Sequence, residues 1–134
     1  MTRLLALDDN LDSAELVARV GTKCGYEARA ISDARSLPEL VKDWNPTVIT
    51  LDLCMPEEDG IVVLSTLQEA GFAGDLFIVS GQDNWLRNTA GRLASALGLK
   101  VTGDFCKPVD LKALRAALTK LRPVENGGAE PVWE

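Results

Sequence analysis

Three aspartates stand where apolar runs of the sequence end. Asp8 and Asp9 follow residues 4–7, and Asp52 follows the β-branched run of residues 47–51. A carboxylate at the end of a buried strand fits a core poorly, but in an open parallel sheet the carboxyl ends of the strands are where ligands and reactive groups lie. Three carboxylates in one small site raise each other's pKa unless a cation neutralises them. Oxygen ligands without histidines or cysteine pairs select a hard ion, so the sequence predicts Mg²⁺ or Mn²⁺.

A hydroxyl and an ammonium group complete this set. Ser80 follows the apolar run of residues 76–79, and Lys107 comes shortly after residues 100–105. A carboxylate that faces a metal ion, with an ammonium nearby, is equipped to accept a phosphoryl group. We therefore expect Asp52 to attack as the nucleophile and form an aspartyl phosphate. The metal ion and Lys107 would neutralise the phosphoryl oxygens, and Ser80 would donate a hydrogen bond to the product phosphate.

Apolar periodicity predicts five strands that alternate with five helices. The predicted strands are residues 4–7, 26–31, 47–51, 75–79 and 100–105, and the predicted helices are residues 13–23, 34–44, 61–70, 84–97 and 111–121. Short loops between them favour an α/β fold, with a parallel sheet covered on both faces through right-handed crossovers. Strand order 2-1-3-4-5 would bring the polar residues to one edge. Residues 1–122 are expected to form one domain, and residues 123–134 a tail or the start of a linker.

Composition excludes several classes of function. The 134 residues carry a net charge of −6 without a dense Lys/Arg stripe, which argues against direct nucleic-acid binding. No apolar run approaches about twenty residues, so no membrane span is expected. The three cysteines lack C-x-x-C spacing, which favours a reduced cytoplasmic location over a disulfide framework or a zinc site. The absence of histidine excludes Ser-His catalysis and a phosphohistidine of the chain's own.

These residues together resemble the receiver domains of two-component response regulators, the family of the chemotaxis regulator with a flavodoxin-like fold. The resemblance covers roughly residues 2–122. It rests on Asp8-Asp9, Asp52-x-x-Met55-Pro56-x-x-Asp59-Gly60, Ser80-Gly81 and Lys107-Pro108, in this order and each at a predicted strand end. Each piece alone is weak, whereas their coincidence is specific.

The resemblance implies a role for each site residue. Asp52 would be the phosphoacceptor, and Mg²⁺ would be held by Asp9, Asp52 and the backbone carbonyl of Cys54, with Asp8 acting largely through water. Ser80 would be the switch hydroxyl. Lys107 would contact the phosphate and precede a cis peptide bond to Pro108.

The resemblance also implies partners. A sensor histidine kinase or a histidine phosphotransfer protein would donate the phosphoryl group. The surface of the fourth helix, fifth strand and fifth helix would then control an output protein or an attached output domain, or form a phosphorylation-linked dimer. Residues 94–103 are similar to receivers attached to cyclic-di-nucleotide phosphodiesterase domains. The chain would be a switch whose phosphotransfer acts only on itself, not an enzyme with turnover on substrates.

The sequence departs from the family pattern at two positions. The family's switch aromatic falls on Asp104, whereas Phe105 is one residue later and so faces the other side of its strand, which predicts a core position for Phe105. Cys54 replaces a residue that is often polar in the family. Both changes bear on the switching mechanism and the phosphate lifetime. Trp85 is equally compatible with an exposed partner-binding residue and with a lid over a helix start.

Three alternatives remain open from the sequence. A haloacid-dehalogenase-type hydrolase would carry a second aspartate two residues after the nucleophile, where this chain has Cys54. A receiver that works by contact alone would not need the intact set of polar residues. The chain is either a stand-alone regulator or the receiver of a longer protein, divided near residues 126–128.

Overall fold

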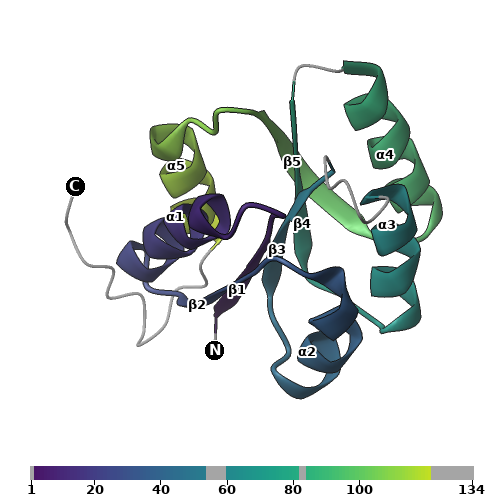
Figure 1. Ribbon diagram of the computed structural model, residues 1–134, viewed down its shortest axis with the longest axis horizontal. Helices are drawn as coiled ribbons and strands as arrows, with labels where there is room; N and C mark the ends of the chain where they lie inside the picture. The colour runs from purple at the N-terminus through teal and green to yellow at the C-terminus, as the bar shows by residue number, and fades with distance from the viewer. Residues whose placement is uncertain (1, 54–59, 82–83, 122–134) are drawn as a thin grey trace.

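The computed structural model describes residues 2–53, 60–81 and 84–121 of the chain, and strands alternate with helices along it (Figure 1). The strands are β1 (Arg3–Leu7), β2 (Glu27–Ile31), β3 (Val48–Asp52), β4 (Asp75–Ser80) and β5 (Lys100–Cys106). The helices are α1 (Leu11–Lys23), the 3₁₀ turn η1 (Ala34–Ser36), α2 (Leu37–Asp43), α3 (Gly60–Glu69), α4 (Asn84–Ala96) and α5 (Leu111–Leu121). Among the described residues, every helix is too short or too polar to cross a membrane.

The five strands form one parallel sheet in the order β2-β1-β3-β4-β5, which confirms the predicted flavodoxin-like fold. The three central strands are buried almost throughout, whereas the edge strands β2 and β5 have exposed residues. This difference follows from coverage, because a central strand of a parallel sheet is packed against helices on both faces. The strand order places the carboxyl ends of β1, β3 and β4 next to one another.

Helices cover both faces of the sheet (Figure 1): α1 and α5 lie on one face, and α2, α3 and α4 on the other. Each face has its own hydrophobic cluster. Leu4, Val48 and Phe77 project from the strands toward α1 and α5, while their chain neighbours Leu5 and Ile49 project to the opposite face. The smaller cluster holds Tyr26, whose hydroxyl donates a hydrogen bond to the carbonyl oxygen of Leu118 (2.7 Å).

Two helices differ from their predicted form. The helix expected over residues 34–44 is divided into η1 and α2, because Pro38 has no N–H to donate to the Ala34 carbonyl in an α-helical turn. The N–H of Leu37 bonds to that carbonyl in the tighter 3₁₀ pattern instead. Helix α1 begins at Leu11, earlier than residue 13, because the side chain of Asn10 accepts a hydrogen bond from the N–H of Ser13 (3.3 Å) and caps the helix.

The apolar side chains of α1 are only partly buried. Leu16 is 45% exposed, whereas Ala14 is 1% exposed. Gly25 follows the C-terminal cap of the helix with a φ of 95°, a conformation that glycine adopts readily. The exposed Leu16 lies on the side of the sheet that α1 and α5 cover.

Gly74 leads into β4 where the chain passes very close to the neighbouring loop. A Cβ atom at Gly74 would lie 2.2 Å from the backbone carbonyl oxygen of Thr47, which accepts the hydrogen bond of the Asp75 N–H (2.9 Å). We expect Gly74→Ala to lower the free energy of unfolding by about 1–3 kcal/mol, since backbone must shift. Urea titration followed by tryptophan fluorescence measures the change.

Gly91 in α4 provides the matched control for this substitution, because a Cβ atom there would meet nothing within 4 Å. Gly91→Ala should raise the free energy of unfolding by about 0.5–1 kcal/mol, the difference in helix propensity. Equal effects of the two substitutions would contradict the close approach at Gly74.

Candidate functional site

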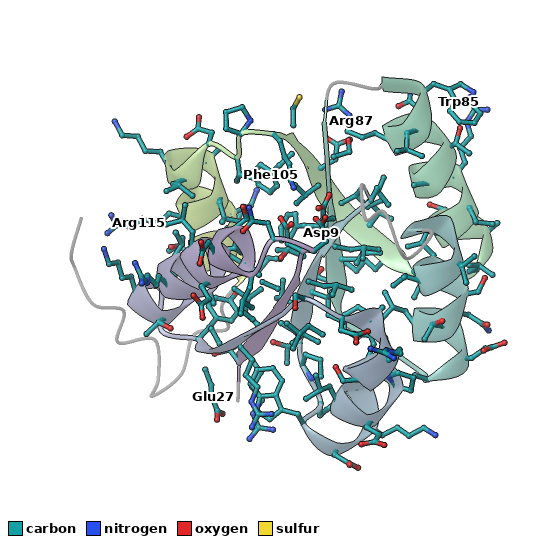
Figure 2. All side chains as sticks on the ribbon, in the orientation of Figure 1. Asp9, Glu27, Trp85, Arg87, Phe105 and Arg115 are labelled. Carbon is teal, nitrogen blue, oxygen red and sulfur yellow. The ribbon has the colours of Figure 1, made fainter. Side chains whose placement is uncertain are left out.

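The three aspartates meet at the carboxyl edge of the sheet. Leu7 of β1 pairs with Leu51 of β3, so the next residues along these strands, Asp8 and Asp52, are neighbours. One carboxylate oxygen from each of Asp8, Asp9 and Asp52 lies within 4.8 Å of the other two. Asp52 is 1% exposed and Asp8 is 7% exposed, whereas Asp9 is exposed and is labelled in Figure 2 at the loop between β1 and α1.

Lys107 connects two of these carboxylates. Its ammonium nitrogen lies 2.9 Å from Oδ2 of Asp52 and 3.1 Å from Oδ2 of Asp8. The backbone helps to hold this side chain in position, because the N–H of Lys107 donates to the carbonyl oxygen of Ser80 (2.7 Å). The Lys107–Pro108 peptide bond is cis, as the resemblance implied. One ammonium beside three carboxylates leaves the ionised site with a net negative charge.

Burial and neighbouring charges shift two pKa values in the site. Burial raises the pKa of Asp8 to about 6, and the charge of Asp52 adds to this increase. The backbone hydrogen bond from Asn10 and the hydrogen bond with Lys107 act in the opposite direction and lower the pKa. For Lys107, burial disfavours the ammonium form, but the hydrogen bonds and charges of Asp52 and Asp8 outweigh it and raise its pKa. Lys107 therefore stays charged at neutral pH, whereas Asp8 takes up a proton near pH 6.

This donor set fits a hard divalent cation. The groups that converge are carboxylate oxygens from Asp8, Asp9 and Asp52, with no nitrogen or sulfur ligand among them. Mg²⁺ prefers such ligands, and it would reduce the repulsion that one ammonium leaves uncompensated. The expected backbone ligand, the carbonyl of Cys54, lies outside the described residues.

Ser80 ends β4 beside this group. It is fully buried, and its hydroxyl donates a hydrogen bond to the carbonyl oxygen of Gly81 (3.3 Å). Asp52 pairs with Val79 in the sheet, so Ser80 lies one residue beyond the strand partner of Asp52. The structure thus brings the predicted serine to the correct edge and strand, with its hydroxyl bonded locally.

The aromatic position differs from the family pattern in the way the sequence predicted. Phe105 is partly buried in the α1–α5 cluster and packs on Phe77, with ring centroids 5.6 Å apart. Asp104 faces α4, is exposed, and lines a shallow hollow together with Arg87 and Arg92. Figure 2 shows the two sides, with Phe105 toward α5 and Arg87 on α4. Trp85 is 71% exposed on α4, which excludes the lid and leaves the exposed alternative (Figure 2).

Sequence reasoning missed a pocket next to the carboxylates that is partly open to solvent. It lies between the sheet, α1 and the start of α5, and its lining includes Ala6, Ala14 and Val109. Because residues two apart in a strand share a face, Ala6 lies on the same face as Asp8. This placement of a small side chain next to the site is the one signal in the sequence for such a pocket. Whether small side chains leave a cavity depends on packing that no spacing rule encodes.

Comparisons with known proteins agree with this geometry. The family model described as "Response regulator receiver domain" matches residues 4–119. Response regulator MprA of Mycolicibacterium vanbaalenii is 28% identical over 94% of this chain and 54% of its own length. Transcriptional regulatory protein BasR of Escherichia coli is 26% identical over 97% of this chain and 56% of its own length, so the chain spans about half of each curated relative.

A solved structure is similar over nearly its whole length. The crystal structure of a response regulator from Colwellia psychrerythraea has a TM-score of 0.78 and 30% sequence identity, and the match covers 90% of this chain and 95% of that chain. The family match, the sheet order and the solved structure agree. This chain belongs to the receiver domains of response regulators, the signalling switches of two-component systems.

Proposed function

We propose that this chain is switched by phosphorylation of Asp52 in a Mg²⁺-dependent reaction. The observation that carries the proposal is the contact of one ammonium, that of Lys107, with both Asp52 (2.9 Å) and Asp8 (3.1 Å) beside a third carboxylate. This arrangement supplies a nucleophile, oxygen ligands for a metal ion and a cation for the phosphoryl oxygens.

The donor is a phosphohistidine of a partner, a sensor histidine kinase or a histidine phosphotransfer protein, since the chain contains no histidine. A carboxylate oxygen of Asp52 forms the new bond to phosphorus while the phosphorus–nitrogen bond of the donor breaks, and the leaving imidazole takes up a proton. Lys107 balances charge on the transferring oxygens. Asp8, Asp9 and Asp52 would hold Mg²⁺, which would supply further positive charge at the same oxygens. Attack by water on the aspartyl phosphate returns the chain to its starting state.

The output side of the switch is the α4–β5–α5 surface. We propose that phosphorylation draws the Ser80 hydroxyl away from the Gly81 carbonyl and toward the phosphate, and that β5 and α4 move with it. Asp104 and the arginines of α4 line this surface, so its change is one of charge and shape rather than of a buried aromatic ring. The reader is an output partner, an attached output domain or a second copy of the chain. Residues 123–134 would be the linker to an attached domain, in a cytoplasmic protein.

Phosphorylation of Asp52 is tested directly by intact mass. With acetyl phosphate and Mg²⁺ the protein should gain a single phosphoryl group, which chelation of Mg²⁺ with EDTA prevents. Asp52→Asn should gain none, because an amide oxygen is a far weaker nucleophile. Asp43→Asn, which changes an exposed aspartate of α2, is the matched control and should be modified like the native protein. An adduct that persists in Asp52→Asn would overturn the assignment.

Removal of the Lys107 ammonium should strengthen Mg²⁺ binding while it slows phosphorylation. Lys107→Ala leaves Asp8 and Asp52 without their cation, so the dissociation constant for Mg²⁺ is expected to fall by roughly tenfold. Isothermal titration calorimetry measures the constant. Lys112→Ala removes an exposed ammonium from α5 and should leave the affinity unchanged. Weaker Mg²⁺ binding in Lys107→Ala would contradict the charge balance proposed here.

The raised pKa of Asp8 predicts opposite effects of pH on metal binding and on folding. Mg²⁺ binding requires ionised Asp8, so the dissociation constant should rise by up to about tenfold per pH unit below the pKa of about 6. Without Mg²⁺, the folded state binds the proton more tightly than the unfolded chain. The free energy of unfolding should therefore fall as the pH rises from about 4 through about 6. Asp8→Asn should remove both dependences, and their persistence would refute the assignment to Asp8.

A further inference from the structure

The α1–α5 side of the sheet holds a cavity of about 190 Å³ directly beneath the acidic site. We call it the α1–β5 pocket. Its walls include apolar side chains from β1, α1, the segment between β5 and α5, and the start of α5, namely Ala6, Ala14, Leu16, Val17, Val109 and Leu111. The cavity opens to solvent, because two of these walls, Leu16 and Leu111, are 45% and 36% exposed.

One end of the pocket is charged. Ala6 of β1 pairs with Thr50 of β3. Asp8 and Asp52 each lie two residues further along the chain and therefore on the same face of the sheet. Both carboxylates and Lys107 are part of the pocket lining. The pocket therefore runs from an apolar interior to a carboxylate group that, with exposed Asp9, keeps a net negative charge beside Lys107.

Size and charge together define the ligand class. An apolar cavity of about 150 Å³ is already large enough to hold benzene, so this pocket accommodates a six-membered ring with a short side chain. The negative end favours a cation over an anion or a neutral group, and an ammonium donates hydrogen bonds that carboxylates accept strongly. We propose that the α1–β5 pocket binds a small primary amine with an apolar body, the ring against α1 and the ammonium on Asp8 and Asp52.

Such a ligand regulates the site. Its ammonium occupies the carboxylates that would hold Mg²⁺, so amine and metal ion exclude each other. A bound amine should therefore suppress phosphorylation of Asp52. This regulatory part of the inference rests on the proposed function, because it presupposes that Asp52 is phosphorylated. The binding part stands on the pocket alone and needs neither Mg²⁺ nor a phosphodonor.

Binding is tested by nuclear magnetic resonance titration of the native chain in Mg²⁺-free buffer. Phenethylamine is the probe, 2-phenylethanol is its neutral counterpart and ethylamine lacks the ring. Phenethylamine should bind saturably, with the largest amide shifts at Ala14, Val17 and Val109, and at least about tenfold more tightly than either counterpart. Excess Mg²⁺ should displace it. No saturable binding would overturn the proposal and leave a partner's apolar side chain as the occupant.

Two variants that fill the pocket test the location. Ala14→Leu and Ala6→Val each add carbon atoms to the lining and should abolish phenethylamine binding, while Ala18→Leu, on the same helix but outside the lining, should not. Both filled variants should also have a higher Tm than the native chain, since they occupy empty space. Undiminished binding in a folded variant, or equal affinity for ethylamine, would mean that the amine meets only the carboxylates and would overturn the proposal.

The two assays separate the possible failures. Phenethylamine binding without acetyl phosphate tests the pocket, and the mass measurement on Asp52→Asn tests the proposed function. If the native chain is phosphorylated at an unchanged rate with the pocket saturated, the regulatory part is refuted and the binding part is not.

Discussion

The contact between the Lys107 ammonium and the carboxylates of Asp8 and Asp52 is the interaction on which the arrangement of this site depends. Two nearly buried carboxylates side by side would repel each other strongly without it, because the protein interior screens charge poorly. The backbone N–H of Lys107 bonds to the carbonyl oxygen of Ser80 at the end of β4, which anchors the lysine at the same edge of the sheet as the two carboxylates. The charge balance of the site is therefore set by the end of the sheet, not by a flexible surface side chain.

The order of the strands explains how a few residues from different strands come together to form the site. β1 and β3 are adjacent central strands, and β4 lies between β3 and β5. Their carboxyl ends carry Asp8, Asp52, Ser80 and, shortly after β5, Lys107. The sheet is packed against helices on both faces and holds these side chains in position at its carboxyl edge. This edge is where open parallel sheets carry their functional sites. The burial that stabilises the strands also raises the pKa of Asp8, so stability and reactivity are coupled at this residue.

The sequence predicted the strands and their polar ends, because apolar runs and the residues that end them are local signals. The strand order, and with it the convergence of these residues, followed from the resemblance to the receiver family. The sequence also predicted that Phe105 and Asp104 face opposite sides, since that follows from the period of a strand. It did not predict the break before α2, where one missing N–H at Pro38 decides between two helical patterns. Nor did it predict the exposure of Leu16 or the cavity beside Ala14, because both depend on how side-chain volumes fill the space between α1, α5 and the sheet.

Asp104 limits how this receiver can pass on a signal. An aromatic ring at this position could be buried or exposed at modest cost, whereas an ionised carboxylate is expensive to bury unless it is paired. Arg87 and Arg92 line the same hollow as Asp104 and are the cations within the described α4–β5 surface that are positioned to pair with it. A displacement of β5 relative to α4 would therefore act on ionic contacts at the surface. Such coupling weakens as salt screens the charges, while coupling through a buried ring does not. Under the proposed function, the identity of residue 104 would therefore decide whether ionic contacts or a buried ring transmit the switch.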